Sequence, residues 1–394
     1  MSKPFYQFFS PVKIIAGHKA LEHVPFELAG LNCSRLMVVT DRGVVQAKLL
    51  EQLFAVFDDA QVSIAALYDN VPADSSLDTV CEATQIYRQQ QCNGILAVGG
   101  GSVIDTAKVV NILASEGGDD PVVHSGAHRL KRPLKPLCVI PTTSGTGSEV
   151  TSVAVISDTK NGVKIPFLSD FLLPTMAVLD GRMTLTLPPA ITAMTAMDAL
   201  THAVEAYTCI GANPLSDAYA VSAIDKISRH LLNVVANPDN LEGRLELAQA
   251  AAMAGIAFSN SMVGMVHALG HALGAVCHLP HGLCMSLFLP AVLRYNQDKP
   301  GNRTGDLLQP LLGEEVCMAT PRQLRCERTI VAIEQLKEDL HKLCALPRTL
   351  KETGKVSRAQ LAHIARLAAD DGTVIFNPKE VDFDDMVAVL ERAW

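Results

Sequence analysis

A long uncharged stretch constrains the fold of this chain more than any other feature. Residues 247–293 contain no Asp, Glu, Lys or Arg. About 20 apolar residues suffice to cross a membrane, so a membrane span is one interpretation. Polar side chains this dense are costly in hydrocarbon, however, and the flanks lack aromatic belts and have few basic residues. We therefore expect a buried helical core that carries a functional site. The interrupting residues are Ser259, Asn260, Ser261, His267, His271, His278 and His281.

Composition excludes several classes of protein. The 394 residues exceed a usual domain of about 100–200 residues, so two domains are expected. A hydrophobic content of 48% argues against disorder. Acidic residues outnumber basic ones 41 to 33, and the one basic cluster, at residues 129–135, is short. This balance argues against a nucleic-acid partner and against attraction to an anionic membrane.

The cysteines and the first residues predict a cytoplasmic protein. Residues 1–6 lack the apolar core of a signal peptide. The ten cysteines form no CxxC pair, and their spacing suggests no metal knuckle. Free thiols are typical of a reducing compartment.

Two textures divide the chain. In the first half, short apolar strands alternate with helical patterns, which is typical of a doubly wound parallel sheet that binds ligands at the carboxyl ends of its strands. After about Leu187 the strand-like runs nearly vanish and long helical stretches follow. We expect an α/β domain at residues 1–187 and an all-helical domain at residues 188–394. The expected strands are residues 12–15, 36–40, 63–68, 95–98 and 137–140, with helices such as 45–57 and 77–90 between them.

A glycine-rich segment is a candidate phosphate site. Gly99, Gly100 and Gly101 follow the strand at 95–98 and precede a helical pattern that opens with Ser102. Consecutive glycines let the backbone approach a phosphate, and free N–H groups at a helix start favour an anion. The pattern is neither GxGxxG nor GxxxxGK[ST]. A tight turn capped by Ser102 is the structural alternative.

A second strand end carries hydroxyl groups. Thr142 and Thr143 open a segment dense in Ser, Thr and Gly that runs to Ser148. Two strand ends that offer hydroxyls and bare amides suit a pyrophosphate. The alternative is a helix capped by Ser148.

Asp41 follows the strand at 36–40. A carboxylate there can bond both ribose hydroxyls of an adenosine and would repel a 2′-phosphate, which favours NAD over NADP. A turn-forming Asp before Gly43 is the alternative interpretation.

Clustered histidines indicate a metal site. Asp198 and His202 have i,i+4 spacing in a helical pattern, and His267 and His271 repeat it, so each pair shares a helix face. His281 follows in a Pro-His-Gly turn. Each residue alone has a structural alternative, such as a core histidine or an Asp bonded to Thr195 or to backbone. Taken together, one carboxylate and several imidazoles suit Fe²⁺ or Zn²⁺. His278 is a weaker candidate.

These segments together resemble the iron-containing (group III) alcohol dehydrogenase family. The family motif GGGSxxDxAK is present from Gly99 to Lys108, and TTxGTGSE from Thr142 to Glu149. MDALxHAxEAY begins at Met197, and GxxHxxxHxxGxxxxxPHG begins at Gly264. The likeness runs from residue 8 to the end of the helical domain.

The resemblance implies an N-terminal dinucleotide-binding α/β domain, a C-terminal helical metal-binding domain, and a homodimer. It places the metal ligands on Asp198, His202, His267 and His281, and it matches His271 to a site histidine that is not a ligand. It places cofactor contacts on Asp41, Gly99, Gly100, Ser102, Thr142, Thr143 and Lys164. The chain departs from the family at Pro72-Ala73-Asp74-Ser75, where relatives often have Pro-Asn-Pro, so the resemblance carries no adenine-side contact over to these residues.

We therefore expect reversible, NAD-dependent oxidation of a primary or small secondary alcohol, with Fe²⁺ (or Zn²⁺) as Lewis acid on the substrate oxygen. His271 is the candidate for proton relay, since imidazole titrates near neutral pH. Two alternatives are a metal- and NAD-using lyase of the dehydroquinate-synthase type and a polyol dehydrogenase of the same fold. The mostly apolar segment at residues 258–281 favours a small alcohol over a phosphorylated, acidic substrate.

Overall fold

A computed structural model describes residues 5–394. Residues 1–4, which belong to the first predicted domain and to the N-terminal segment without a signal-peptide pattern, lie outside the described residues. The described chain forms two compact units. One is Ser10–Thr186, and the other combines residues 5–9 with Leu187–Trp394.

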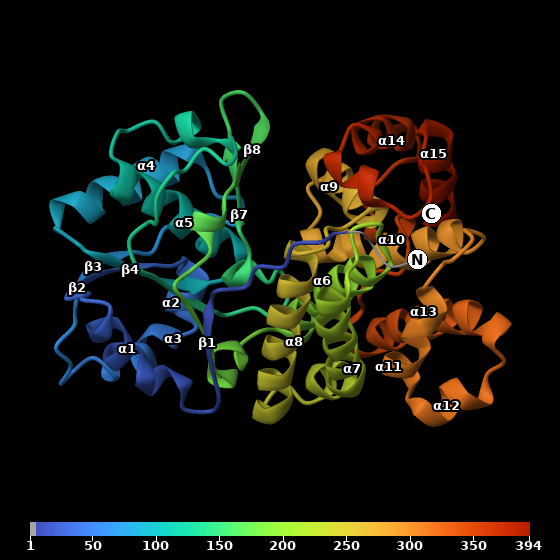
Figure 1. Cartoon of the computed structure of the whole chain (residues 1–394), viewed down its shortest axis with the longest axis horizontal. Helices are drawn as coiled ribbons and strands as arrows, with labels where there is room; N and C mark the ends of the chain where they lie inside the picture. Colours follow the sequence, from blue (N-terminus) through green and yellow to red (C-terminus); the bar gives the residue numbers. More distant parts are fainter. Residues whose placement is uncertain (1–4) are drawn as a thin grey trace. The chain divides into compact units, whose positions relative to one another are not determined.

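The unit Ser10–Thr186 is built on a parallel sheet of six strands, which confirms the predicted α/β class (Figure 1). Every neighbouring pair in this sheet is parallel. The carboxyl ends of the strands therefore lie along one edge. In spatial order the strands are β1 (Lys13–Ala16), β9 (Met176–Leu179), β6 (Leu137–Pro141), β4 (Gly94–Gly99), β2 (Arg35–Val39) and β3 (Ser63–Tyr68).

Helices cover both faces of this sheet because its strands are apolar on both faces. In β2, Leu36 and Val38 belong to one core, whereas Met37 and Val39 belong to the other. Successive side chains of a strand point to opposite faces, so a near-continuous apolar run needs cover on both. α1 (Val24–Gly30) and α3 (Leu49–Ala55) supply residues to the first core, and α4 (Leu77–Gln89) and α5 (Gly101–Glu116) to the second.

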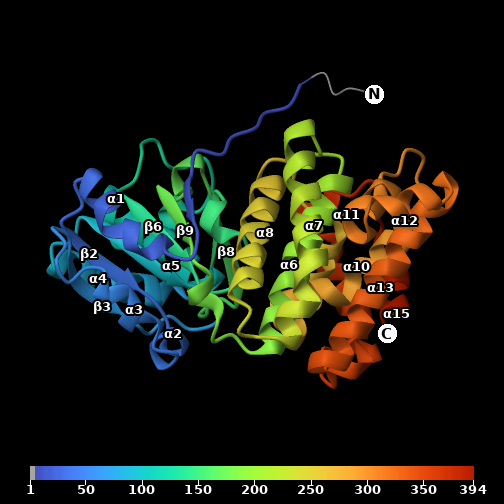
Figure 2. The same cartoon turned by 90° about the horizontal axis from the view of Figure 1, so that it is seen from below.

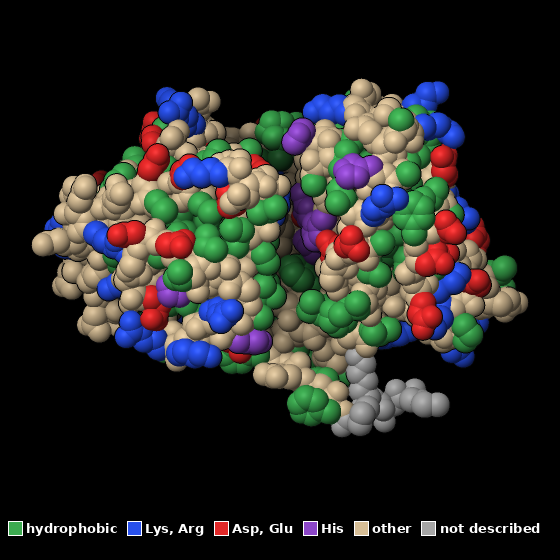
Figure 3. All heavy atoms as spheres, turned by 90° about the horizontal axis from the view of Figure 1, so that it is seen from above, with side chains coloured by type: hydrophobic (Ala, Val, Ile, Leu, Met, Phe, Trp, Pro, Cys, Tyr) green, Lys and Arg blue, Asp and Glu red, His purple; other side chains and the backbone are tan. Residues whose placement is uncertain are grey.

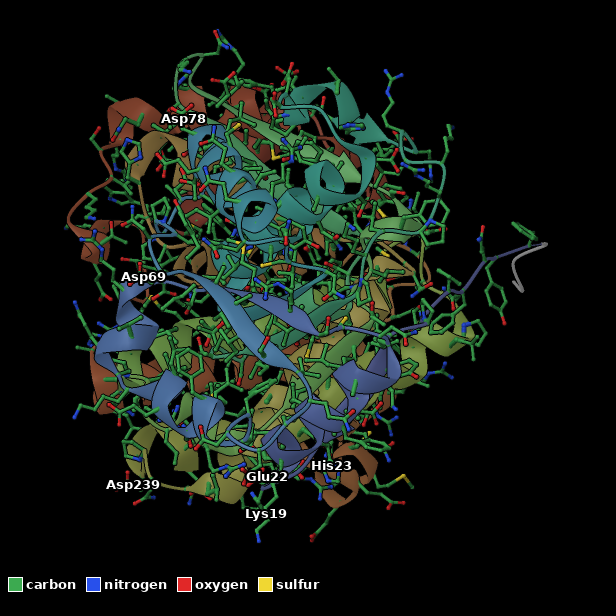
Figure 4. All side chains as sticks on the ribbon, turned by 90° about the vertical axis from the view of Figure 1, so that its left-hand side faces the viewer. Lys19, Glu22, His23, Asp69, Asp78 and Asp239 are labelled. Carbon is green, nitrogen blue, oxygen red and sulfur yellow. The ribbon has the colours of Figure 1, made fainter. Side chains whose placement is uncertain are left out.

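The polar side of one short helix illustrates the solvent-facing surface. η1 (Ala20–His23) buries Ala20 and Leu21, while Lys19, Glu22 and His23 point outward together (Figure 4). Glu22 is held by Arg182, which approaches it to 2.7 Å.

Some elements differ from expectation. The helix predicted at residues 45–57 is two helices, α2 (Arg42–Gln46) and α3, because Lys48 takes a left-handed backbone conformation with φ 58°. The strand β9 was not predicted, nor was a small second sheet of β5 (Gly126–Ala127), β7 (Val153–Asp158) and β8 (Val163–Leu168). In this second sheet β7 and β8 are antiparallel.

The second unit is helical, as predicted; its described residues contain no strand. Three long helices pack side by side in it: α6 (Pro189–Thr208), α7 (Pro214–Ala236) and α8 (Leu241–Ser259) (Figure 2). Proline at the first turn suits α6 and α7, and Asn213 caps α7 with a capping box. The other helices are α9 (Met265–Cys277), α10 (His281–Asn296), α11 (Leu308–Leu312), α12 (Glu314–Ala319), α13 (Arg325–Cys344), α14 (Leu361–Ala369) and α15 (Phe383–Arg392).

The uncharged stretch forms most of α8, all of α9 and most of α10, and its apolar side chains dominate the core of this unit. Among the described residues, no helix has the length and apolar character to span a membrane. Residues 5–9 pack with this unit, whereas the sequence pattern predicts them in the first domain. The side-chain amide of Asn260 makes two hydrogen bonds to the backbone of Phe9. It accepts from the Phe9 N–H at 2.6 Å and donates to the Phe9 carbonyl at 3.2 Å.

Candidate metal centre and cofactor loops

The glycine turn after β4 is sterically required in this structure. A Cβ at Gly99 would lie 2.5 Å from a Val103 methyl group, and one at Gly101 would lie 2.9 Å from Thr146. Gly100 is the N-cap of α5 and makes no side-chain cap. Ser102 does not cap the helix; its hydroxyl donates to the Ala73 carbonyl at 2.5 Å. The backbone amides of the first turn of α5 therefore have no side-chain acceptor among the described residues, as an anion site requires.

The hydroxyl segment after β6 packs directly on that turn. The N–H of Thr142 donates to the Gly99 carbonyl at 3.0 Å, and Thr143 lies against Gly100, where a Cβ would come within 3.3 Å of its hydroxyl. The helix with a Ser148 cap is not formed: the short turn η3 (Ser148–Val150) is capped by Gly147 at φ 63°, and Ser148 bonds elsewhere. The structure thus brings Gly99, Gly100, Thr142 and Thr143 together at the carboxyl ends of β4 and β6.

Asp41 stands at the end of the neighbouring strand β2. Thr40 links that strand end to β4 by donating its hydroxyl to the Val98 carbonyl at 2.7 Å. The Asp41 carboxylate accepts from Val44 N–H at 2.9 Å and so caps α2. The turn-forming role is therefore present, and one carboxylate oxygen remains for another donor.

Lys164 lies on β8, outside the six-stranded sheet. Its ammonium is 3.1 Å from Asp74, and both side chains are exposed. Asp74 belongs to the loop that departs from the family pattern, and Ser102 ties this loop to α5 through Ala73. The structure thus connects Lys164 to the glycine turn by way of this loop.

Four ligand-type side chains converge in the helical unit. α6 carries Asp198 and His202, α9 carries His267, and His281 is the first residue of α10. One nitrogen or oxygen of each residue lies within 4.8 Å of those of the other three. Asp198, His202 and His267 are buried, whereas 41% of the His281 side chain is exposed. Histidine side chains gather on this part of the helical unit (Figure 3).

The electrostatics of this group favour a cation. The Asp198 oxygen that faces His281 at 3.4 Å makes no hydrogen bond within the described chain, and neither does Nε2 of His267. Burial raises the pKa of Asp198, and burial lowers the pKa of His267, so His267 is neutral and can offer a lone pair. Buried polar atoms without partners are rare in native proteins. A metal ion held by these four side chains would satisfy both atoms.

Glu205 fixes the orientation of His267. It lies on α6, one turn after His202, and its carboxylate contacts Nδ1 of His267 at 2.5 Å while accepting from Val266 N–H at 2.7 Å. Burial raises the pKa of Glu205 to about 7. A carboxylate on the distal nitrogen is the usual support of a metal-binding histidine. Phe258 supports His202 in a different way, by stacking on its ring at 4.3 Å.

His271 lies beside the four-residue group. Its ring stacks on His281 with centroids 5.5 Å apart and meets His267 edge-on at 5.8 Å. Its Nδ1 bonds to Asp371 at 2.8 Å. Burial alone would raise the pKa of Asp371, but hydrogen bonds from His271 and Thr373 lower it, so Asp371 is a carboxylate. His278, by contrast, ends α9 in a left-handed conformation with φ 51° and is not among the four.

Sequence reasoning missed three residues of this site. Glu205 has i,i+3 spacing from His202 in the same motif, so its face of α6 could have been noticed. Phe258 and Asp371 have no spacing pattern that links them to the site. Asp371, for example, is 100 residues from its partner His271.

The comparisons with known proteins agree with this geometry. The family of iron-containing alcohol dehydrogenases matches residues 11–181, and the C-terminal part of the Fe-containing alcohol dehydrogenase family matches residues 192–394. The chain belongs to the iron-containing alcohol dehydrogenase family. The resemblance inferred from the sequence motifs is thereby confirmed.

Two relatives that match over nearly their whole length are dehydrogenases of small alcohols. The NAD-dependent methanol dehydrogenase of Bacillus methanolicus is 32% identical over 98% of this chain and 99% of its own. The 1,3-propanediol dehydrogenase of Klebsiella pneumoniae is 33% identical over 100% of both chains. Among solved structures, a 1,3-propanediol oxidoreductase superposes with a TM-score of 0.93 at 32% identity, covering 99% of this chain and 100% of that one. A sulfoacetaldehyde reductase of Bifidobacterium kashiwanohense, solved with NAD⁺, has a TM-score of 0.86 at 26% identity over 99% of both chains.

Proposed function

We propose that this protein is a metal-dependent, NAD-linked alcohol dehydrogenase that interconverts a primary or small secondary alcohol and its aldehyde or ketone. The observation that carries the proposal is the convergence of Asp198, His202, His267 and His281 within 4.8 Å in a chain of this family. One carboxylate and three imidazoles suit Fe²⁺, and Zn²⁺ accepts the same set. When bound, the ion supplies Lewis acidity toward the substrate oxygen.

The residues around the ligands prepare the site for that chemistry. Glu205 holds His267 by Nδ1 and leaves Nε2 directed to the metal position. Phe258 covers His202, and most of the surrounding α9 surface is apolar and buried, which excludes water from the His202 and His267 side of the site. Water exclusion strengthens the interaction of a fixed charge with a developing one.

Oxidation of an alcohol releases a proton as well as a hydride, and His271 is the proposed carrier of that proton. Asp371 holds its Nδ1 and fixes the ring, so the other nitrogen remains to accept the proton. With 44% of its side chain exposed, His271 can pass the proton to solvent.

We assign the cofactor to residues 1–187 and the metal to residues 188–394. The glycine turn, Ser102, Thr142 and Thr143 would surround the pyrophosphate, Asp41 the adenosine ribose, and Lys164 would approach from β8. The support is the shared strand edge and the NAD-dependence stated for the methanol dehydrogenase relative. We also infer a cytoplasmic homodimer: all ten cysteines are free thiols, and the family resemblance implies the dimer.

The lyase alternative is disfavoured because the relatives are dehydrogenases that act on CH–OH groups. A polyol dehydrogenase of the same fold differs in substrate alone, so a panel of alcohols, diols and polyols decides between them.

The test combines chelation with substitution. Protein purified without added metal should contain iron or zinc by elemental analysis. It should oxidise short alcohols with NAD⁺, and lose this activity on chelation. His267→Ala should lose both the metal and the activity, whereas His363→Ala, which removes an exposed histidine of α14, should keep both. Full activity in metal-free His267→Ala would contradict the proposal.

A further inference from the structure

The motif that carries the glycine turn also supplies two side chains that do not face the phosphate position. Asp105 and Lys108 stand one turn apart on α5, so they share a face of that helix. Lys108 is fully buried, and Asp105 is partly buried. Both side chains reach toward residues 148–155, the segment that leaves the hydroxyl loop and enters β7.

Lys108 is saturated by oxygen acceptors of this segment. Its ammonium donates to the carbonyls of Thr151 and Val153, each at 2.8 Å, and to the hydroxyls of Ser148 and Thr151, each at 3.1 Å. Four acceptors for three N–H donors leave no donor for a ligand. Burial lowers the pKa of Lys108 to about 8, against the opposing charges of Asp105 and Glu149, so it is protonated at neutral pH.

Asp105 completes the connection. One of its oxygens accepts from the Ser148 hydroxyl at 2.7 Å, and the other accepts from Val155 N–H at 2.9 Å. The Ser148 hydroxyl therefore donates a hydrogen bond to Asp105 and accepts one from Lys108. Both of its roles are thus used within the protein. Hydrogen bonds to charged groups are the strong ones, so this network holds the segment firmly to α5.

The consequence concerns the two cofactor loops. The glycine turn is continuous with α5, and the hydroxyl loop packs on it through Thr146 against Gly101 and Thr143 against Gly100. The network fastens the far end of the hydroxyl loop to the same helix. Apart from this network, close packing and the bond from Thr142 N–H to the Gly99 carbonyl hold the two loops together.

We propose that Asp105 and Lys108 are positioning residues for the dinucleotide pyrophosphate: they clamp the hydroxyl loop to α5, and Lys108 does not contact the phosphate itself. This inference rests on the proposed NAD-binding function. It differs from the expectation that a lysine in a phosphate-binding motif binds phosphate directly.

Binding of ADP and adenosine to the full-length protein tests the clamp without turnover. ADP carries a pyrophosphate and adenosine carries none. A displacement of the loop at the phosphate position should therefore weaken the binding of ADP and not that of adenosine. Lys108→Met should raise the dissociation constant of ADP, measured by calorimetry, about tenfold or more. The constant of adenosine should change less than about twofold, because its contacts lie elsewhere. Lys131→Met, which removes an exposed lysine of the same unit, should leave both unchanged.

Ser148→Ala separates the clamp from direct contact and provides a milder variant if Lys108→Met folds poorly. It removes no charge, yet it should also raise the dissociation constant of ADP. Its effect should not add to that of Lys108→Met, since both substitutions break the same network. The clamp would be overturned if Ser148→Ala left the dissociation constant of ADP unchanged, or if the variants lost affinity for ADP and adenosine equally. Wild-type protein that binds neither ADP nor NAD⁺ would overturn the cofactor assignment together with it.

Discussion

The carboxylate of Glu205 lies 2.5 Å from Nδ1 of His267, and both side chains are buried. Because Nδ1 is occupied, the ring can present only Nε2 to a metal. We expect Glu205→Gln to weaken the proposed metal site about 10–100-fold, the usual cost of losing such a support. The dissociation constant of the metal, measured by chelator competition, checks this independently of activity.

Asp371→Asn is the matched control for that substitution. It removes a carboxylate from His271, which is outside the four-residue group, so metal affinity should stay near wild type. Its effect belongs to proton transfer: Asp371→Asn and His271→Gln should both lower turnover and alter its pH profile. Full activity with an unchanged pH profile in His271→Gln would remove the relay role.

Gly282 determines how closely α10 approaches α6. A Cβ at this position would lie 2.4 Å from the Met194 carbonyl oxygen, which is backbone and cannot move aside easily. Gly282→Ala should push the start of α10 away from α6 and carry His281 from its 3.4 Å approach to Asp198. Overpacking of this kind costs about 1–3 kcal/mol.

The expected result for Gly282→Ala is weaker metal binding together with a lower melting temperature. Gly274→Ala in α9 is the control, since its Cβ would meet nothing closer than 3.6 Å and alanine favours a helix. If Gly282→Ala bound metal as tightly as Gly274→Ala, the close approach would have no role in the site.

The fold could be predicted where local patterns decide the structure. The strand predicted at residues 95–98 lies within β4, which is buried along its whole length, because a buried parallel strand reads as a continuous apolar run. β9 has only four residues, and its place between β1 and β6 depends on long-range pairing. No glycine or proline marks the left-handed conformation at Lys48, so the sequence pattern could not predict the break between α2 and α3.

The site divides in the same way. Helical spacing could place Asp198 with His202 and His267 with His271, since each pair lies on one helix. That Asp198, His202 and His267 meet His281, while His271 turns to Asp371, follows from the packing of α6, α9 and α10. Long-range packing of this kind leaves no periodicity in the sequence.

Asp41 caps α2, and its proposed second role in cofactor selection can be separated from the cap by substitution. As the cap of α2 it accepts a backbone N–H, which Asn also does, whereas repulsion of a 2′-phosphate needs its charge. Asp41→Asn should keep stability and shift preference toward NADP by about tenfold, corresponding to roughly 1.4 kcal/mol. Asp41→Ala should also lose about 1 kcal/mol of stability.

The measurement is the ratio of dissociation constants for NAD⁺ and NADP⁺, with chemical unfolding alongside. Asp120→Asn is the control, because Asp120 caps a turn in the same way at 2.9 Å but is not at a strand end of the main sheet. An unchanged ratio in Asp41→Asn would place the cofactor discrimination elsewhere.

Lys337 should make the stability of the helical unit rise at alkaline pH. It is buried on α13, where its ammonium donates to the Arg348 carbonyl at 3.1 Å, and burial lowers its pKa to about 8. An unfolded lysine has a pKa of about 10.4, so between about pH 8 and 10.4 the unfolded state binds more protons than the folded one. The free energy of unfolding therefore gains up to about 1.4 kcal/mol per pH unit from this residue in that window.

Lys337→Met should remove this gain. The unfolding free energy of the wild type should therefore rise relative to that of the variant as the pH increases. The single tryptophan, Trp394, packs against the core of the helical unit, and its fluorescence reports urea unfolding of that unit. Lys342→Met is the control, since it removes an exposed lysine from the same helix. A pH-independent difference between Lys337→Met and wild type would mean that Lys337 stays charged in the core, held by the carbonyl groups of Leu287 and Arg348.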